Sequence, residues 1–103
     1  MSKIRFGAKL NILPEFCDVP DYEKLRDILL ECEELGYHSA WVLDHLIWGR
    51  AGPLECWTTL SALASETRKI HLGPLVTCHS FRLPSVLAKM GATLDVISGG
   101  RLE

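Results

Sequence analysis

The chain has 103 residues, enough for one domain and too few for two, since compact domains usually run from about 50 to 250 residues. Apolar residues make up 48% of the chain and charged residues 23%, which is typical of globular domains and excludes a disordered or fibrous chain. The net charge of -2 provides no basic block for nucleic acid or anionic lipid, and no apolar run reaches the roughly 20 residues of a membrane span, so we expect neither partner.

The first predicted elements are a strand over residues 4–10 and a helix that begins near Pro20 or Asp21. Proline suits the first helical turn, and the carboxylates of Asp21 and Glu23 complement the positive end of the helix dipole. Gly36 supplies the left-handed residue that ends the helix. One apolar face of this helix is formed by Tyr22, Leu25, Leu29, Cys32 and Leu35. The amino terminus has no apolar run of signal-peptide length, and we therefore expect a cytoplasmic protein.

Two more pairs of strand and helix follow. A strand over residues 39–43 precedes a helix that starts at Pro53 and ends near Thr67. The inner face of that helix carries Trp57, Leu60, Leu63 and Ala64. A strand over residues 70–77 precedes a helix that starts at Pro84 and ends at Gly99 and Gly100. The inner face of the last helix carries Val86, Leu87, Met90, Leu94 and Ile97, and a fourth strand is expected to begin at Arg101.

The regular alternation of strands and helices predicts an α/β fold with a parallel sheet. The strands recur about every 31 to 35 residues, which matches the roughly 31 residues per unit of a (β/α)8 barrel. A doubly wound open sheet is the alternative, but its G-x-G-x-x-G fingerprint is absent, because Gly7 is the only glycine around the first strand. We predict a partial TIM-type (β/α)8 barrel, with about three βα units and the start of a fourth strand, as one domain over residues 1–103.

Polar side chains follow the second predicted strand, at the end where the active sites of barrels lie. Asp44 and His45 come directly after this strand, and Trp48 follows three residues later. An imidazole changes charge near neutral pH, so His45 could transfer a proton while Asp44 fixes its tautomer. The alternative is structural, with Asp44 capping the following loop and His45 making an ordinary hydrogen bond.

The third predicted strand also runs into polar residues, Cys78 and His79. Neighbours in a strand point to opposite faces, which argues against a nucleophile pair formed by these two side chains. Arg82 follows them and precedes the third helix. We expect Arg82 to pair with a carboxylate on the helix side rather than with an anionic ligand group.

The spacing of cysteines and histidines predicts no metal site. No C-x-x-C pair occurs among the four cysteines, Cys17, Cys32, Cys56 and Cys78. This favours ordinary reduced thiols. The histidines show no H-x-x-x-H spacing. His38 and His71 precede their strands, which places them at the amino-terminal face of a barrel, where residues contribute to stability instead of catalysis.

Eight stretches of the chain, taken together, carry a family resemblance. They are Phe6-Gly7, then Glu34 to Tyr37 with Ala40 to His45, then Glu55 with Leu60 to Ala64, then Thr67 to Thr77, Arg82 to Lys89, and Thr93 to Leu102. These stretches resemble the luciferase-like flavin- and deazaflavin-dependent oxidoreductases, nearly from end to end. The resemblance implies an eight-stranded barrel that binds a flavin or the deazaflavin coenzyme F-420 at the carboxyl ends of the strands.

The resemblance also implies roles for individual residues. The Asp44-His45 pair is more similar to the F-420-dependent branch, which transfers hydride, than to the FMN-dependent monooxygenases with their Glu-His pairs. By this likeness His45 lies near the reactive ring, Asp44 supports the cofactor or His45, and Trp48 flanks a small organic substrate. The family carries a non-prolyl cis peptide bond in its third strand, and Cys78-His79 occupies the matching stretch. The implied cofactor-binding residues are Val76, Thr77, Cys78 and His79.

The resemblance covers only the amino-terminal portion of the family's barrel. The later strands, which in relatives provide the phosphate site and in some members a catalytic carboxylate, follow residue 103. We therefore expect a luciferase-like oxidoreductase part that lacks independent activity, with an FMN-dependent monooxygenase or an inert, cofactor-free, self-associating half-barrel as alternatives. A three-stranded sheet leaves two unpaired edges and one uncovered face, so we expect a homo-oligomer that completes the barrel by self-association.

Overall fold

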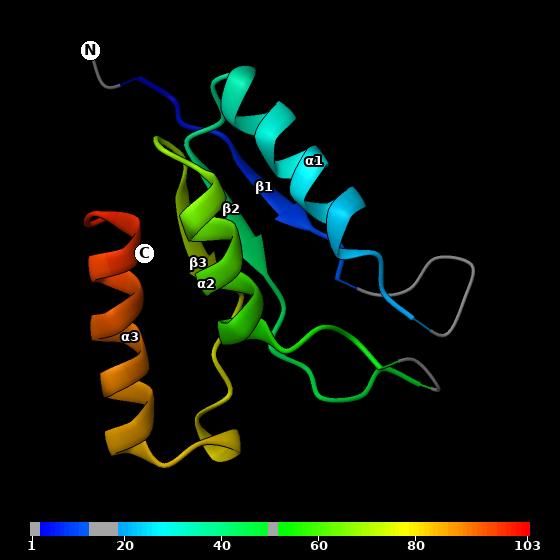
Figure 1. The fold of residues 1–103 in the computed structure, drawn as a ribbon, viewed down its shortest axis with the longest axis vertical. Helices are drawn as coiled ribbons and strands as arrows, with labels where there is room; N and C mark the ends of the chain where they lie inside the picture. Colours follow the sequence, from blue (N-terminus) through cyan, green and yellow to red (C-terminus); the bar gives the residue numbers. More distant parts are fainter. Residues whose placement is uncertain (1–2, 13–18, 50–51) are drawn as a thin grey trace.

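The computed structural model of the chain describes residues 3–12, 19–49 and 52–103. Within these residues, three strands alternate with three helices (Figure 1). The elements are β1 Gly7–Leu10, α1 Tyr22–Glu34, β2 Ser39–Val42, α2 Cys56–Glu66, β3 His71–Pro74, a short 3-10 turn η1 His79–Phe81, and α3 Pro84–Ser98. The order confirms the predicted α/β fold.

The strands form one parallel sheet in the order β1-β2-β3. Ser39 is the register partner of both Gly7 in β1 and His71 in β3. A fourth segment begins beside β3, because Leu72 and Leu102 form a parallel bridge. The predicted start of a fourth strand is therefore confirmed, and the arrangement agrees with three βα units of a (β/α)8 barrel.

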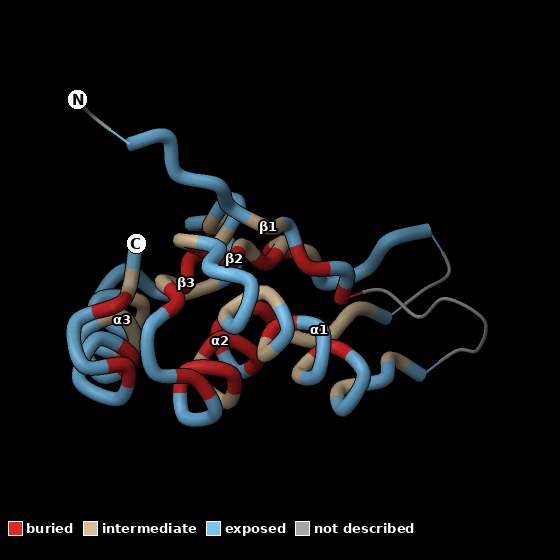
Figure 2. Tube along the Cα trace, turned by 90° about the horizontal axis from the view of Figure 1, so that it is seen from above, coloured by how far each residue is buried: buried red, intermediate tan, exposed pale blue. Residues whose placement is uncertain are grey.

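All three helices lie on one side of the sheet (Figure 2). Alternate strand residues such as Ala40 and Val42 are buried against these helices. They meet the helix side chains that the apolar periodicity predicts to face inward, including Leu29 of α1 and Leu60 of α2, which are fully buried. The core lies between sheet and helices, and no helix of the described residues lies over the other face of the sheet.

Trp41 lies on the uncovered face of the sheet. Its indole N–H donates to the hydroxyl of Ser39 at 3.0 Å. A Cβ atom on Gly7 would come within 2.8 Å of the indole nitrogen, and one on Gly73 within 2.7 Å of the far side of the ring. The two neighbouring strands therefore carry glycine where the indole crosses them.

The boundaries of several elements differ from the prediction. The predicted strand over residues 4–10 begins only at Gly7, which is the register partner of Ser39, the first residue of β2. Before this pair, the N–H of His38 still donates to the carbonyl of Phe6 at 2.8 Å. The second helix begins at Cys56 instead of Pro53, since the extended Glu55 is its N-cap and accepts a hydrogen bond from the N–H of Thr58.

The second and third strands are also shorter than predicted. The strand predicted over residues 39–43 ends at Val42, and the one predicted over residues 70–77 spans only His71 to Pro74. Proline lacks the N–H that a continuing strand would donate. The non-prolyl cis bond lies between Leu75 and Val76, three residues before the expected Cys78-His79 position, so that expectation is corrected.

The predicted ends of the first and third helices are confirmed. Asp21 caps α1, because its carboxylate accepts from the N–H of Lys24 at 3.0 Å, and Gly36 has the expected positive φ. Gly99 caps α3 in the left-handed conformation. The apolar faces are narrower than predicted, however, since Leu35 is 70% exposed and Ile97 of α3 is 47% exposed.

Arg101 ties the carboxyl ends of two helices to the start of β3. Its buried guanidinium donates to carbonyl oxygens of Ala64, Thr67, Ile70 and, through Nε, Ser98. No carboxylate pairs with it in these bonds, so backbone oxygens satisfy the charge. No helix in the described part of the chain has the length and apolar composition needed to cross a membrane.

Candidate functional site

The loops after β2 and β3 meet at the carboxyl end of the sheet. Asp44, two residues past the end of β2, is buried and accepts a hydrogen bond from the backbone N–H of Cys78 at 2.8 Å. Because strand ends in a parallel sheet share one edge, residues 34 positions apart are joined here. This contact places the predicted catalytic and cofactor-binding stretches side by side.

Arg82 holds Asp44 through two hydrogen bonds. The guanidinium donates from both terminal nitrogens to the two carboxylate oxygens, at 2.7 and 2.9 Å. Burial alone raises the pKa of Asp44, but the bonds from Arg82 and from the Cys78 N–H outweigh it and hold that pKa below its usual value. Asp44 is therefore a fixed carboxylate at neutral pH.

Glu55 completes the ion-pair cluster. Its carboxylate accepts from Arg82 as well as from the N–H of Thr58 in the first turn of α2. The hydrogen bond to Asp44, which outweighs burial, and the bond to Glu55 together raise the pKa of Arg82 above its usual value. The predicted pairing of Arg82 with a carboxylate on the helix side is confirmed by Glu55. The role of Glu55 itself was not predicted, because no local pattern links a helix cap to an arginine 27 residues away.

His45 lies next to this cluster but outside it. Its half-buried imidazole packs edge-on against Trp48, with ring centroids 4.7 Å apart at 67°. In the described part of the chain, no hydrogen bond joins Asp44 to His45, because the carboxylate oxygens are directed to Arg82 and Cys78. The structure thus favours a structural role for Asp44, although its bonds reach Arg82 and the loop after β3 instead of the loop that directly follows it. The chemical role of His45 stays a prediction.

The predicted cofactor-binding stretch follows β3 and leads into η1. Val76 is 73% exposed, whereas Thr77 and Cys78 are half-buried. His79 begins η1, and its Nε2 lies 3.5 Å from the hydroxyl of Ser80. Their roles toward a cofactor stay predictions.

The described cysteines are free thiols, as predicted. Cys32 and Cys78 are half-buried, and Cys56 is buried. Burial raises the pKa of Cys56 to about 12, so this thiol stays protonated at neutral pH. Cys17 lies outside the described residues.

Apolar side chains are exposed in both loops at this end of the sheet. Trp48, which packs against His45, is 51% exposed, Ile47 is 72% exposed, and Val76 in the loop after β3 is 73% exposed. An apolar surface beside an imidazole, at the carboxyl ends of parallel strands, suits a flat aromatic ring system. The residues present therefore fit the ring of a flavin or deazaflavin.

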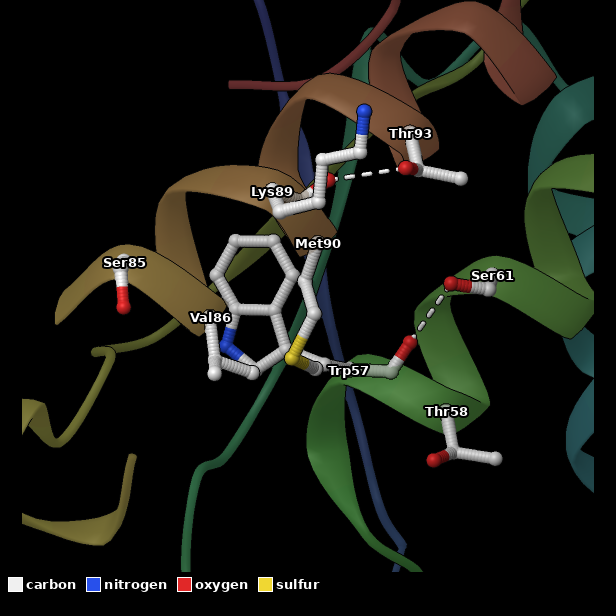
Figure 3. Close-up of a pocket in the computed structure, with 8 residues that line it drawn as sticks. All are labelled: Trp57, Thr58, Ser61, Ser85, Val86, Lys89, Met90 and Thr93. Carbon is white, nitrogen blue, oxygen red and sulfur yellow. Dashed lines mark hydrogen bonds between the residues drawn. The ribbon is translucent and has the colours of Figure 1, made fainter. Parts of the chain in front are cut away.

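A separate cavity of about 560 Å³ lies between α2 and α3 (Figure 3). The indole of Trp57 and the thioether of Met90 approach each other within it, and the buried Trp57 N–H has no hydrogen-bond partner among the described residues. The other lining residues are Thr58, Ser61, Ser85, Val86, Lys89 and Thr93. Because all of them belong to the two helices, this cavity is not part of the candidate site.

Comparisons with known proteins agree with this arrangement. Residues 5–103 match the family model described as luciferase-like monooxygenase. The chain is 33% identical to the F420-dependent glucose-6-phosphate dehydrogenase of Amycolatopsis mediterranei, over 76% of this chain and 25% of that protein. It is 31% identical to the 4-hydroxyprotoasukamycin monooxygenase of Streptomyces nodosus subsp. asukaensis, over 98% of this chain and 28% of that protein.

A solved structure shows the same fold. The coenzyme F420 dependent tetrahydromethanopterin reductase from Methanopyrus kandleri superposes on 98% of this chain with a TM-score of 0.81 and 32% sequence identity. The match covers 26% of the reductase chain. The chain thus spans about a quarter of the length of the relatives it matches.

Proposed function

Since the chain belongs to the luciferase-like monooxygenase family, we propose that it forms part of an oxidoreductase that transfers hydride with coenzyme F-420. The observation that carries the proposal is the Asp44-His45 pair at the carboxyl end of β2. There Arg82 fixes the carboxylate, while the imidazole packs against the half-exposed indole of Trp48. Two relatives that bear F420 in their names support the deazaflavin, and the monooxygenase relative makes FMN the alternative.

The contacts of Asp44, His45 and Trp48 support a different role for each of these residues. Asp44 takes up no proton at neutral pH, because its pKa is lowered, and it holds the loop after β3 through the Cys78 N–H. His45 is the proposed catalytic residue, since its imidazole can hold or move a proton near the reacting atoms. The deazaflavin, when bound, supplies the acceptor or donor of hydride. Trp48 packs against His45 and would exclude water from one side of a small organic substrate.

The proposed cofactor contacts come from the loop after β3. The residues concerned are Val76, Thr77, Cys78 and His79. Val76 offers an exposed apolar surface for a ring, and the hydrogen bond from Cys78 to Asp44 keeps this loop close to His45. The phosphate-bearing tail of the cofactor is assigned to no residue of the chain.

The proposal is tested by titrating the chain with coenzyme F-420 and, separately, with FMN, following the visible absorption and fluorescence of each cofactor. We expect saturable binding of F-420 that is tighter than that of FMN. His45→Ala should weaken F-420 binding several-fold, because the imidazole and its contact with Trp48 are lost. His38→Ala, which removes an imidazole before β2 at the other end of the sheet, is the matched control and should bind as the parent does.

The outcomes separate the alternatives. Tighter binding of FMN contradicts the deazaflavin assignment and favours the monooxygenase branch. Binding of neither cofactor by a folded chain, checked by circular dichroism, contradicts the proposal and favours the inert half-barrel. Equal affinities of the parent and His45→Ala contradict the role of His45.

A further inference from the structure

His38 and His71 lie side by side at the amino ends of β2 and β3. The parallel register pairs Ser39 with His71, and the backbone N–H of His71 donates to the carbonyl of His38 at 2.9 Å. The two imidazole rings stack with centroids 4.7 Å apart and planes inclined by 16°. Two half-buried imidazoles are thus brought together by strand pairing, although they are 33 positions apart in the sequence.

Glu103 joins the two histidines from the segment beside β3. Its backbone N–H donates to the carbonyl of Leu72 at 2.9 Å, which fixes the position of the residue. One carboxylate oxygen lies 2.9 Å from Nδ1 of His71. Each of the three side chains offers one ligand atom, an imidazole nitrogen or a carboxylate oxygen. These three atoms all lie within 4.8 Å of one another.

We propose that His38, His71 and Glu103 bind a divalent transition-metal ion of the zinc class. Two imidazole nitrogens and one carboxylate oxygen form a donor set that zinc uses when it keeps a fourth position for water. Tetrahedral zinc holds its ligand atoms about 3.3 Å apart, so the three side chains must approach one another further. The side chains of His71 and Glu103 are 34% and 39% exposed and can rotate without disturbing the core.

A cationic side chain, Arg5, contacts the site. Arg5 lies on the exposed segment before β1, and its guanidinium donates to Nε2 of His38 at 3.2 Å. A bound cation is repelled by this guanidinium and competes with it for the imidazole. Arg5→Ala should therefore tighten metal binding, and weaker binding by that variant would contradict the proposed position of the ion.

The role of such an ion is structural. It would link β2, β3 and the segment after α3 at the end of the sheet away from His45 and Cys78. Because the ion binds only where these segments are paired, it favours the folded chain by mass action. The proposal does not depend on the cofactor chemistry described above.

The test is a titration of the chain with Co²⁺ alone, followed by visible absorption, with Zn²⁺ added afterwards as the competitor. We expect one ion per chain, no thiolate-to-cobalt charge-transfer band, and a midpoint of thermal unfolding that rises with metal. His71→Ala should weaken binding by more than the roughly 10- to 100-fold that follows loss of an outer-shell partner.

Two further variants keep the test decisive. Glu103→Gln preserves the shape of an exposed side chain and should also weaken binding, so a failure of His71→Ala to fold does not decide the outcome. His79→Ala removes an imidazole from η1, at the other end of the sheet, and should bind as the parent does. Absence of saturable binding, a thiolate band, or equal affinities of Glu103→Gln, His79→Ala and the parent would overturn the proposal.

Discussion

At the scale of single residues, Asp44 and Arg82 form a buried ion pair at the candidate site. Their side chains are 1% and 9% exposed, so both charges have left water. A buried ion pair adds little stability compared with apolar side chains of the same shape, but each partner needs the other. The pair therefore fixes the position of the loops around the candidate site more than it stabilises the fold.

Removing Arg82 should be costly, because it leaves two carboxylates without their partner. We expect Arg82→Ala to lower the free energy of unfolding by about 3 to 5 kcal/mol, as measured by denaturant titration. The matched control is Arg26→Ala, which removes an arginine from the surface pair with Asp27, and it should change the stability little. Equal effects of the two substitutions would show that Arg82 and Asp44 are not buried together.

At the scale of elements, Glu33 connects the last turn of α1 to the segment between α2 and β3. Its carboxylate accepts hydrogen bonds from the backbone N–H groups of Arg68, Lys69 and Ile70, at 2.7 to 3.2 Å. Partial burial raises the pKa of Glu33, but these three donors outweigh it and lower the pKa below its ordinary value. The helix thus holds the entry to β3 through one side chain.

This lowered pKa predicts a pH dependence of stability. Because the folded pKa is below the unfolded one, Glu33 stabilises the fold fully above the unfolded value of about 4.3, and this contribution is lost as the pH falls toward the folded pKa. Glu33→Gln should therefore lower the free energy of unfolding at pH 7, and the difference from the parent should shrink in acid. Denaturant titrations from pH 7 to about pH 3 measure it. Parallel curves for the two chains would contradict the role of Glu33.

At the scale of the whole molecule, the three helices of the described residues cover one face of the sheet, and none of them covers the other face (Figure 2). Apolar side chains remain exposed in the segments before β1 and after β3, with Ile4 83%, Phe6 67% and Val76 73% exposed. Apolar surfaces and unpaired strand edges favour association. We therefore propose that the chain self-associates.

Light scattering should give a mass above that of one 11.5 kDa chain. Phe6→Lys should shift the assembly toward the monomer, because it places a charge beside the start of β1. Val96→Lys is the control, since Val96 is 81% exposed on α3, among the helices on the other side of the sheet. A parent chain that stays monomeric at all concentrations, or equal effects of both variants, would contradict self-association.

Local signals in the sequence were sufficient to predict the type and order of the helices and strands. Asp21 and Gly36 mark the ends of α1 because capping acts within one helical turn, and the spacing of the strands predicted three βα units of a barrel. The position of Asp44 and His45 after a strand also predicted where the candidate site lies. The starts of β1 and α2 were wrong by three residues, because partner strands and the cap at Glu55 decide them.

Only the tertiary structure decided which distant residues meet. Asp44 and Arg82 are 38 positions apart, and no spacing in the sequence connects them or adds Glu55. Likewise, the spacing of His38 and His71 predicts no metal site, yet the pairing of β2 with β3 stacks the two imidazoles. The physical reason is that helix caps and apolar periodicity act over a few residues, whereas strand register fixes contacts between segments that lie more than thirty residues apart.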